Sequence, residues 1–184
     1  MREFEDRGAM LAALPLKGAT CAEIGVLHGD FSSQIKAQDP RSLFLIDPWK
    51  AQDIRAYADI NNHSQEVFDE MYLEVCERFK PGNSVYISRM FSHEAARHYA
   101  LRFAHQFDFI YIDANHSYSG VLSDLFMWYP LMRRGGWLAG HDYKALPFYG
   151  VTQAVEEFCR ITGNEVAIET QEPLWKSFAI QIGG

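Results

Sequence analysis

The sequence predicts one α/β domain built on a mostly parallel sheet of about seven strands. The first observation is the alternation of short apolar runs with longer stretches of helical periodicity, which is typical of parallel strands joined by helical crossovers. The second is size and composition. The chain has 184 residues, of which 48% are hydrophobic and 22% charged, which suits one well-packed domain and is short for two. We therefore expect a single domain over residues 1–184.

Five apolar runs account for the centre of the sheet, because near-continuous apolar character suits strands that are covered on both faces. They span residues 21–26, 43–46, 85–87, 107–112 and 137–139, and a turn at Gly135 and Gly136 precedes the last. Helices are expected at residues 31–37, 64–79, 92–105, 118–132 and 151–161, and the short runs 165–168 and 175–180 would close the sheet. The polar segment 48–62 fits neither pattern and is a candidate substrate-side loop or lid.

Charge and composition narrow the class of partner. The net charge of -7 and the lack of clustered Lys and Arg argue against nucleic acid, so a small-molecule substrate fits better. No apolar run approaches the length of a membrane span, and the N-terminus lacks the apolar core of a signal peptide. The three cysteines are far apart and form no disulfide or metal motif. We expect a cytoplasmic protein with no membrane or nucleic-acid partner.

The first strand leads into a glycine loop with the pattern Glu23-x-Gly25-x-x-x-Gly29. Glycines at such a turn let the backbone approach a ligand closely, and the start of the next helix, which includes Ser32, presents free N–H groups to it. The spacing differs from the G-x-G-x-x-G pattern that cradles a pyrophosphate, which favours a nucleoside without phosphates. Alternatively, the two glycines only shape the turn.

The second strand ends in an acid, Asp47. A carboxylate placed about 20 residues beyond a glycine loop can accept hydrogen bonds from both hydroxyls of a ribose. The alternative is that Asp47 caps the turn formed with Pro48 and Trp49. Taken together, the glycine loop and Asp47 indicate an adenosine site more strongly than either does alone.

The fourth strand ends in Asp113, and His116 follows on the same turn. The carboxyl edge of an open α/β sheet is where such proteins bind ligands, so both side chains are expected in the site. A neutral imidazole there could take a proton from a substrate hydroxyl at physiological pH. The alternative for His116 is a residue at a helix start that the backbone satisfies, but its place beside Asp113 favours catalysis.

The fifth strand ends in His141 and Asp142. This strand is expected to lie beside the fourth, which brings both residues toward Asp113. Two carboxylates and a histidine at adjacent strand ends suit Mg²⁺ or a similar divalent ion, with water or substrate oxygens completing its shell. Alternatively, Asp142 only caps the next segment.

With these residues in place, the chain resembles the Rossmann-like class I S-adenosylmethionine-dependent methyltransferases, most closely the bacterial group called methyltransferase family 24. The resemblance runs from about Ala22 to Tyr143. Besides the glycine loop, it is carried by three motifs: Asp47-Pro48-Trp49, Ile112-Asp113-Ala114-x-His116-x-Tyr118, and Gly135-Gly136-x-Leu138-x-Gly140-His141-Asp142-Tyr143. The last two are the most discriminating. They imply a doubly wound sheet whose last strand is antiparallel.

The resemblance also implies roles for individual residues. Glu23 and Gly25 would flank the methionine part of S-adenosylmethionine, and Asp47 would hold its ribose. The residues that would line the adenine are Ser88, Arg89, Met90 and Phe91. Related sugar O-methyltransferases bind Mg²⁺ through an acid matching Asp113 and a pair matching His141 and Asp142, and a histidine matching His116 resembles their general base. This chain departs from the acidic pair by having His141.

These observations predict methyl transfer from S-adenosylmethionine to a hydroxyl of a small sugar-like or phenolic acceptor. His116 and Asp113 would be the catalytic residues, and Mg²⁺ would assist. Two alternatives stay open: a non-catalytic S-adenosylmethionine-binding domain, and a nicotinamide-dependent oxidoreductase. A second subunit could complete the acceptor pocket, so a homodimer is plausible.

Overall fold

The computed structural model describes residues 1–53, 61–82, 84–144 and 149–183. Its strands are β1 (Arg2–Phe4), β2 (Thr20–Ile24), β3 (Ser42–Asp47), β4 (Val85–Arg89), β5 (Phe107–Ile112), β6 (Met132–Tyr143), β7 (Val166–Thr170) and β8 (Lys176–Gln181). Its helices are α1 (Arg7–Ala13), α2 (Asp30–Ala37), α3 (Gln65–Phe79), α4 (Ser92–Phe103), α5 (Tyr118–Trp128) and α6 (Val151–Thr162), and the short 3-10 helix η1 (Tyr129–Leu131) follows α5.

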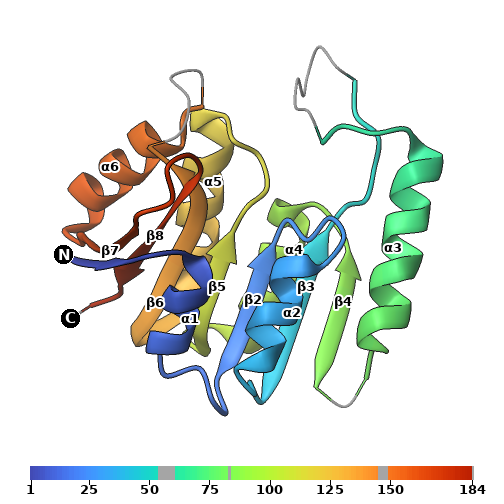
Figure 1. The fold of residues 1–184 in the computed structure, drawn as a ribbon, viewed down its shortest axis with the longest axis horizontal. Helices are drawn as coiled ribbons and strands as arrows, with labels where there is room; N and C mark the ends of the chain where they lie inside the picture. Colours follow the sequence, from blue (N-terminus) through green and yellow to red (C-terminus); the bar gives the residue numbers. More distant parts are fainter. Residues whose placement is uncertain (54–60, 83, 145–148, 184) are drawn as a thin grey trace.

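All eight strands form one sheet in the order β1-β7-β8-β6-β5-β2-β3-β4 (Figure 1). Strand β8 is antiparallel to its neighbours β6 and β7, and every other adjacent pair of these strands is parallel. The predicted α/β fold, mostly parallel with an antiparallel last strand, is therefore confirmed.

The structure adds two elements at the N-terminus that the sequence pattern did not predict. Strand β1 pairs in parallel with β7 at the edge of the sheet, which brings the number of strands to eight rather than about seven. Helix α1 follows, and the Asp6 carboxylate caps it by accepting a hydrogen bond from the Ala9 N–H at 2.8 Å. Both elements are short and depend on contacts with distant segments, so local periodicity does not reveal them.

The run predicted at residues 137–139 is part of a twelve-residue strand, β6. Gly135 and Gly136 therefore lie inside this strand and not in a turn before it. The Gly136 backbone explains the extension: its carbonyl accepts a hydrogen bond from the Ile182 N–H at 2.9 Å, so pairing continues toward the start of β6. The helix predicted to reach residue 132 ends at Trp128, and η1 with Pro130 follows it.

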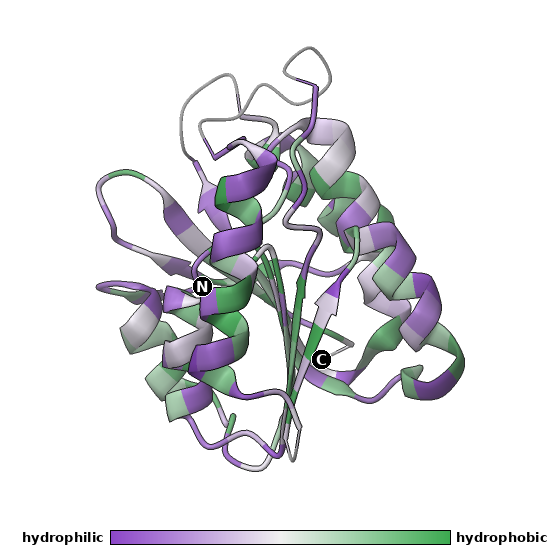
Figure 2. Ribbon diagram, turned by 90° about the vertical axis from the view of Figure 1, so that its right-hand side faces the viewer, coloured by the Kyte–Doolittle hydropathy of each residue, from purple (hydrophilic) through white to green (hydrophobic). Residues whose placement is uncertain are grey.

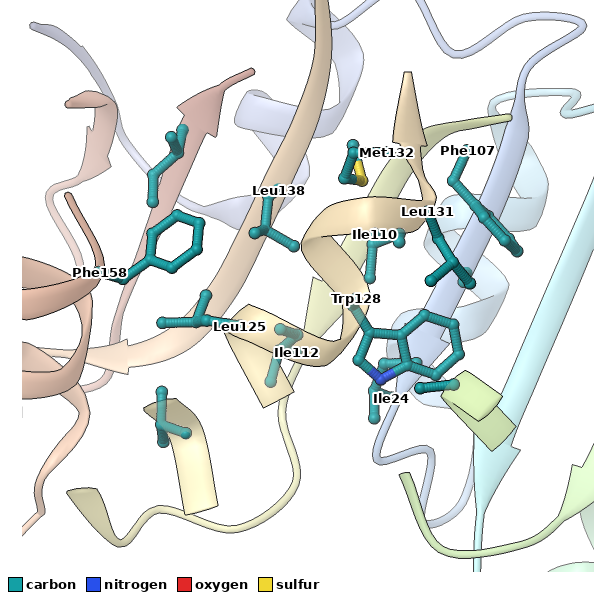
Figure 3. Packing of buried hydrophobic residues seen from close by; sticks show 14 of the residues in the cluster. Ile24, Phe107, Ile110, Ile112, Leu125, Trp128, Leu131, Met132, Leu138 and Phe158 are labelled. Atoms are coloured by element: carbon teal, nitrogen blue, oxygen red, sulfur yellow. The ribbon is translucent and has the colours of Figure 1, made fainter. Parts of the chain in front are cut away.

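Two apolar layers hold the helices against the sheet. One layer buries residues of α4, α5 and α6, and the other buries residues of α1, α2 and α3. Figure 2 shows the sheet edge-on between the two groups of helices. Figure 3 shows how Leu125 and Trp128 of α5 and Phe158 of α6 pack near Ile110 and Leu138 of the sheet, all of them buried. Burial on both faces explains the apolar runs in the sequence.

This arrangement places the carboxyl ends of β2, β3, β5 and β6 at one edge of the sheet, since these strands are parallel. The residues predicted to be functional follow these ends. Within the described ranges, none of the helices is both long and apolar enough to cross a membrane.

Candidate functional site

A cavity of about 420 Å³ opens at this edge of the sheet. Besides Phe91, which is described below, five of the predicted site residues line it, namely Glu23, Gly25, Asp47, Asp113 and His116. They come from the ends of β2, β3 and β5 and from the loop before α5. The fold thus gathers into one cavity residues that are up to 93 positions apart in the sequence (from 23 to 116).

Gly25 lets the turn after β2 lie directly against the turn after β5. Its φ is 89°, and a Cβ at this position would lie 1.8 Å from the backbone oxygen of Asp113. Any side chain would therefore push these two turns apart. Gly29 has a different task. It precedes α2, and a Cβ there would lie 2.7 Å from the ring of Phe79, outside the cavity lining.

Glu23 supplies a buried carboxyl group to the cavity wall, with 2% of the residue exposed. The Ser32 hydroxyl donates a short hydrogen bond to its Oε2. Burial raises the pKa of Glu23 well above its usual value, and the Ser32 hydrogen bond and the charge of Arg7 offset this only in part. A ligand ammonium group beside Glu23 would supply a favourable positive charge.

Asp47 holds the glycine loop in place. Its Oδ2 accepts hydrogen bonds from the N–H groups of Val26 at 2.9 Å and Leu27 at 3.1 Å, and its Oδ1 accepts one from the Trp49 N–H at 2.7 Å. Burial raises the pKa of Asp47, and these three hydrogen bonds counteract it. The structure therefore shows both the turn-capping contact with Trp49 and a carboxylate on the cavity wall, where a ribose could bind.

Asp113, His116, His141 and Asp142 form a compact cluster at the ends of β5 and β6. The His116 Nε2 lies 2.8 Å from Asp142 Oδ2 and 3.5 Å from Asp113 Oδ1. The His141 Nδ1 lies 3.6 Å from both Asp113 Oδ2 and Asp142 Oδ1. Burial raises the pKa of Asp113, but the His116 hydrogen bond and the charges of His141 and Arg7 outweigh it, so the net pKa is lowered.

The orientation of His116 is fixed from two sides. Asp142 binds its Nε2, and the ring of Tyr149 stacks on the imidazole with centroids 4.8 Å apart and planes 12° apart. Asp142 adopts a φ of 55°, which is uncommon for a residue other than glycine and often marks a functional site. The cluster is therefore a pre-organised arrangement of an imidazole between carboxylates.

The same cluster offers a donor set for a divalent ion. Asp113, His141 and Asp142 each present one ligand atom, and these atoms lie within 4.8 Å of one another. Two carboxylate oxygens and one imidazole nitrogen suit a hard or borderline divalent ion that keeps water ligands. Asp142 can serve both tasks, because Oδ2 contacts His116 while Oδ1 faces His141.

The chain also matches a known protein family. The family model described as "Methyltransferase domain" of methyltransferase family 24 matches residues 22–143, which include the cavity residues Glu23, Gly25, Asp47, Asp113 and His116. This chain belongs to that methyltransferase family. Among curated protein sequences, no match was found.

Solved structures share the fold of this methyltransferase domain. The N-methyltransferase NodS of Bradyrhizobium japonicum aligns with a TM-score of 0.66 at 12% identity, covering 97% of this chain and 95% of that one. A Corynebacterium glutamicum protein aligns at 0.63 and 18% identity, covering 97% and 82%. An S-adenosylmethionine-dependent methyltransferase of Mesorhizobium loti aligns at 0.62 and 11%, covering 94% and 95%. At these identities the likeness concerns the fold.

Membership of the family implies S-adenosylmethionine as the cofactor, and the methyltransferase cavity fits this molecule. Glu23 offers a carboxyl group that an ammonium group would stabilise in its charged form, Asp47 offers carboxylate oxygens for ribose hydroxyls, and Gly25 lets the backbone come close. A nicotinamide dinucleotide would need the pyrophosphate spacing that the loop lacks.

The residues expected at the adenine lie differently from the prediction. Ser88 donates to or accepts from the Tyr99 hydroxyl at 2.6 Å, Arg89 forms an ion pair with Asp69, and Met90 packs against the apolar layer. None of these three lines the cavity. Phe91, predicted with them, does line it, together with Ser92 and His93 at the start of α4. The cavity wall in this region is therefore formed by residues 91–93 and not by residues 88–90.

Among the charged residues of the cavity, Arg7 and Asp124 have no role in the sequence-based predictions. The Arg7 guanidinium lies over the Phe31 ring, 4.7 Å from its centroid, with Nη1 3.7 Å from Asp113 Oδ2. It reaches the site only because α1 packs there, so no local signal marks it. Asp124 did carry a signal: it lies at helical spacing between the buried residues Val121 and Trp128.

The segment 48–62 was predicted as a loop or lid, and residues 54–60 of it lie outside the described part of the chain. Its flanks contact each other, because the Gln52 N–H donates to the Asn62 side chain at 3.1 Å and the Asn62 amide donates to the Gln52 carbonyl at 2.9 Å. Lys50, Gln52 and Asn61 line the cavity. These flanks therefore form part of the site.

Proposed function

We propose that this protein transfers a methyl group from S-adenosylmethionine to a hydroxyl oxygen of a small acceptor that is sugar-like or phenolic. The observation that carries the proposal is that the two predicted catalytic residues, His116 and Asp113, line the cavity. The predicted cofactor ligands Glu23 and Asp47 line the same cavity. A group that can accept a proton therefore stands beside the expected cofactor site. A domain that only bound the cofactor would have no use for a histidine oriented by Asp142.

The cofactor supplies an electrophilic methyl group on a sulfonium. The protein must then orient the acceptor oxygen and remove its proton. In our proposal His116 accepts that proton. Asp142 and Asp113 hold the imidazole and stabilise the imidazolium that forms, since both carboxylates lie within 3.5 Å of Nε2. The stacked ring of Tyr149 limits rotation of the imidazole.

Asp113, His141 and Asp142 would hold a divalent ion such as Mg²⁺. An ion at this place would lower the pKa of an acceptor hydroxyl and thereby assist its deprotonation. The support for this part of the proposal is the chemistry of the three donors and their separation. His141 adds a nitrogen ligand where the resembled sugar enzymes have an acid, so Mn²⁺ should be compared with Mg²⁺.

The test is a pair of measurements on the purified protein. Calorimetry with S-adenosylhomocysteine and NAD, each with and without Mg²⁺, should show binding of the first only. Methyl transfer from labelled S-adenosylmethionine is then screened over hydroxylated acceptors, with sugars first and catechols second. Binding of NAD without binding of S-adenosylhomocysteine would refute the proposal. Cofactor binding with transfer only to amine acceptors would refute the O-methyl assignment.

A further inference from the structure

One buried acid of the cavity has no part in the proposed chemistry. Asp124 of α5 is 7% exposed and lies on the apolar face of the helix, between the buried residues Val121 and Trp128. Burying a carboxyl group among apolar side chains is costly unless hydrogen bonds or charges compensate. Its presence on this face therefore calls for a ligand or a structural partner.

The structural partner of Asp124 is the Ser92 hydroxyl, which binds one of the two carboxyl oxygens. The Trp128 indole N–H donates to Ser92 Oγ at 2.9 Å, and the Ser92 hydroxyl donates to Asp124 Oδ1 at 2.5 Å. Because the indole can only donate, the hydroxyl proton of Ser92 must point to Asp124. This chain of two hydrogen bonds fixes the plane of the carboxyl group.

The second oxygen of Asp124 is left for the cavity. In the described part of the chain, the recorded hydrogen bond of this carboxyl group uses Oδ1, and no fully buried side-chain oxygen or nitrogen lacks a partner. Oδ2 is therefore not sealed in the interior, and Asp124 lines the cavity. The fold presents a single, oriented carboxylate oxygen to whatever binds there.

The environment of Asp124 indicates a hydrogen-bond donor as its ligand. Burial raises the pKa of this carboxyl group to about 6, and the Ser92 hydrogen bond and the charge of His93 lower it only in part. Near neutral pH the group is still mostly ionised, and an ionised carboxylate only accepts hydrogen bonds. A ligand N–H would compensate for the burial.

Neighbouring residues identify which part of the ligand this is. Asp124 is bonded to Ser92 at the start of α4, and Phe91 and Ala114 add apolar surface to the same cavity. Glu23, Arg7 and Asp113 form another group, in which the Arg7 charge acts on both acids. The surroundings of Asp124, Ser92 and Phe91 suit a flat base that carries an amino group. The surroundings of Glu23, Arg7 and Asp113 suit the charged amino-acid end of the cofactor.

We propose that Asp124 Oδ2 accepts a hydrogen bond from the exocyclic amino group of the cofactor's adenine, with Ser92 and Trp128 as positioning residues. This inference rests on the proposed binding of S-adenosylmethionine. Asp124 is then a specificity residue, which recognises the adenine base and takes no part in methyl transfer.

The test is a cycle that pairs a change in the protein with a change in the ligand. Calorimetry measures the affinity of wild type and Asp124→Ala for S-adenosylhomocysteine and for its analogue with an unsubstituted purine, which lacks only the amino group. Wild type should prefer the adenine compound by about 10- to 100-fold, and Asp124→Ala should bind both about equally. Ser119→Ala, an exposed residue of α5 that does not line this cavity, should keep the wild-type preference.

Asp124→Asn is the second variant in case alanine unfolds the protein. Its carbonyl can still accept from Ser92, which leaves an amide N–H₂ facing the amino group of adenine, so the preference for adenine should disappear. A preference that persists in both variants, or no preference in wild type, overturns the inference while leaving the proposed function intact. Failure of wild type to bind either compound refutes the proposed function, and this inference with it.

Discussion

Asp113 and Asp124 line the same cavity, yet their carboxyl groups have opposite pKa shifts. Burial raises both. At Asp113 a hydrogen bond with His116 and the charges of His141 and Arg7 reverse the effect and lower the pKa. At Asp124 the Ser92 hydroxyl and the charge of His93 do not suffice, and the pKa is about 6. More positive groups act on Asp113 than on Asp124, and at Asp113 they outweigh the effect of burial.

The difference indicates how the cavity is divided. The end around Asp113, which we call the transfer end, is a set of mutually paired charged groups, and our proposal assigns proton transfer to it. The end around Asp124, which we call the base end, has one acid with a neutral partner, and a ligand would complete it. Changes to the charged side chains of the transfer end should therefore affect turnover, and changes to Asp124 at the base end should affect binding and stability.

The largest effect is expected at the transfer end from His116→Ala. Loss of a positioned base should lower kcat about 100- to 10,000-fold, whereas the affinity for S-adenosylhomocysteine should not change. The measurements are kcat with an identified acceptor and calorimetry. His98→Ala, an exposed histidine of α4, is the control and should behave as wild type. An equal loss of cofactor affinity would show that His116 is structural.

Gly25→Ala should damage the transfer end through the backbone. The added methyl group would meet the Asp113 carbonyl at 1.8 Å, and φ would remain positive. We expect the free energy of unfolding to fall by about 2–4 kcal/mol in urea denaturation. Gly18→Ala has a similar φ of 71° with nothing within 4 Å of the new carbon, and should lose only about 1 kcal/mol. Equal losses would mean that the close approach carries no cost.

Asp142→Asn should lower turnover about 10- to 100-fold, because this carboxylate orients His116 and belongs to the candidate metal site. Cofactor affinity should stay at the wild-type value. If a divalent ion takes part, the variant should also lose any stimulation by Mg²⁺ or Mn²⁺. Wild-type activity that a chelator leaves undiminished would remove the metal from the proposal.

The smallest effect is expected at the base end and has the opposite sign. The pKa of Asp124 is higher in the folded protein than in the unfolded chain, so the folded state binds the proton more tightly. Stability is therefore lost as pH rises from about 4 to about 6 and stays constant above that range. The change in the free energy of unfolding caused by Asp124→Asn should be about 1–3 kcal/mol more favourable at pH 8 than at pH 4.

Urea denaturation across that pH range measures this difference. Asp30→Asn is the matched control, because its carboxyl group is 81% exposed, and it should change stability by no more than about 0.5 kcal/mol at either pH. If Asp124→Asn changes the free energy of unfolding equally at pH 4 and pH 8, or more favourably at pH 4, the contrast between the two ends fails.

Several of the acids at both ends of the cavity could be located from the sequence. The apolar runs and their terminal acids predicted that Asp47, Asp113 and His116 meet at one sheet edge, because strand ends and burial on both faces leave local patterns. The acid at Asp124 also left a pattern, as a charged residue within the apolar stripe of α5. Its hydroxyl partner did not, since Ser92 is 32 residues away.

The sequence by itself determined the order of the elements from β2 onward, the parallel sheet and the acids at its edge, because these follow from local periodicity. Only the tertiary structure decided which polar groups touch. It paired His116 with Asp142, oriented Asp124 through Ser92, brought Arg7 into the cavity and added β1 beside β7. Such contacts join residues far apart in the chain, so packing decides them and no local pattern records them.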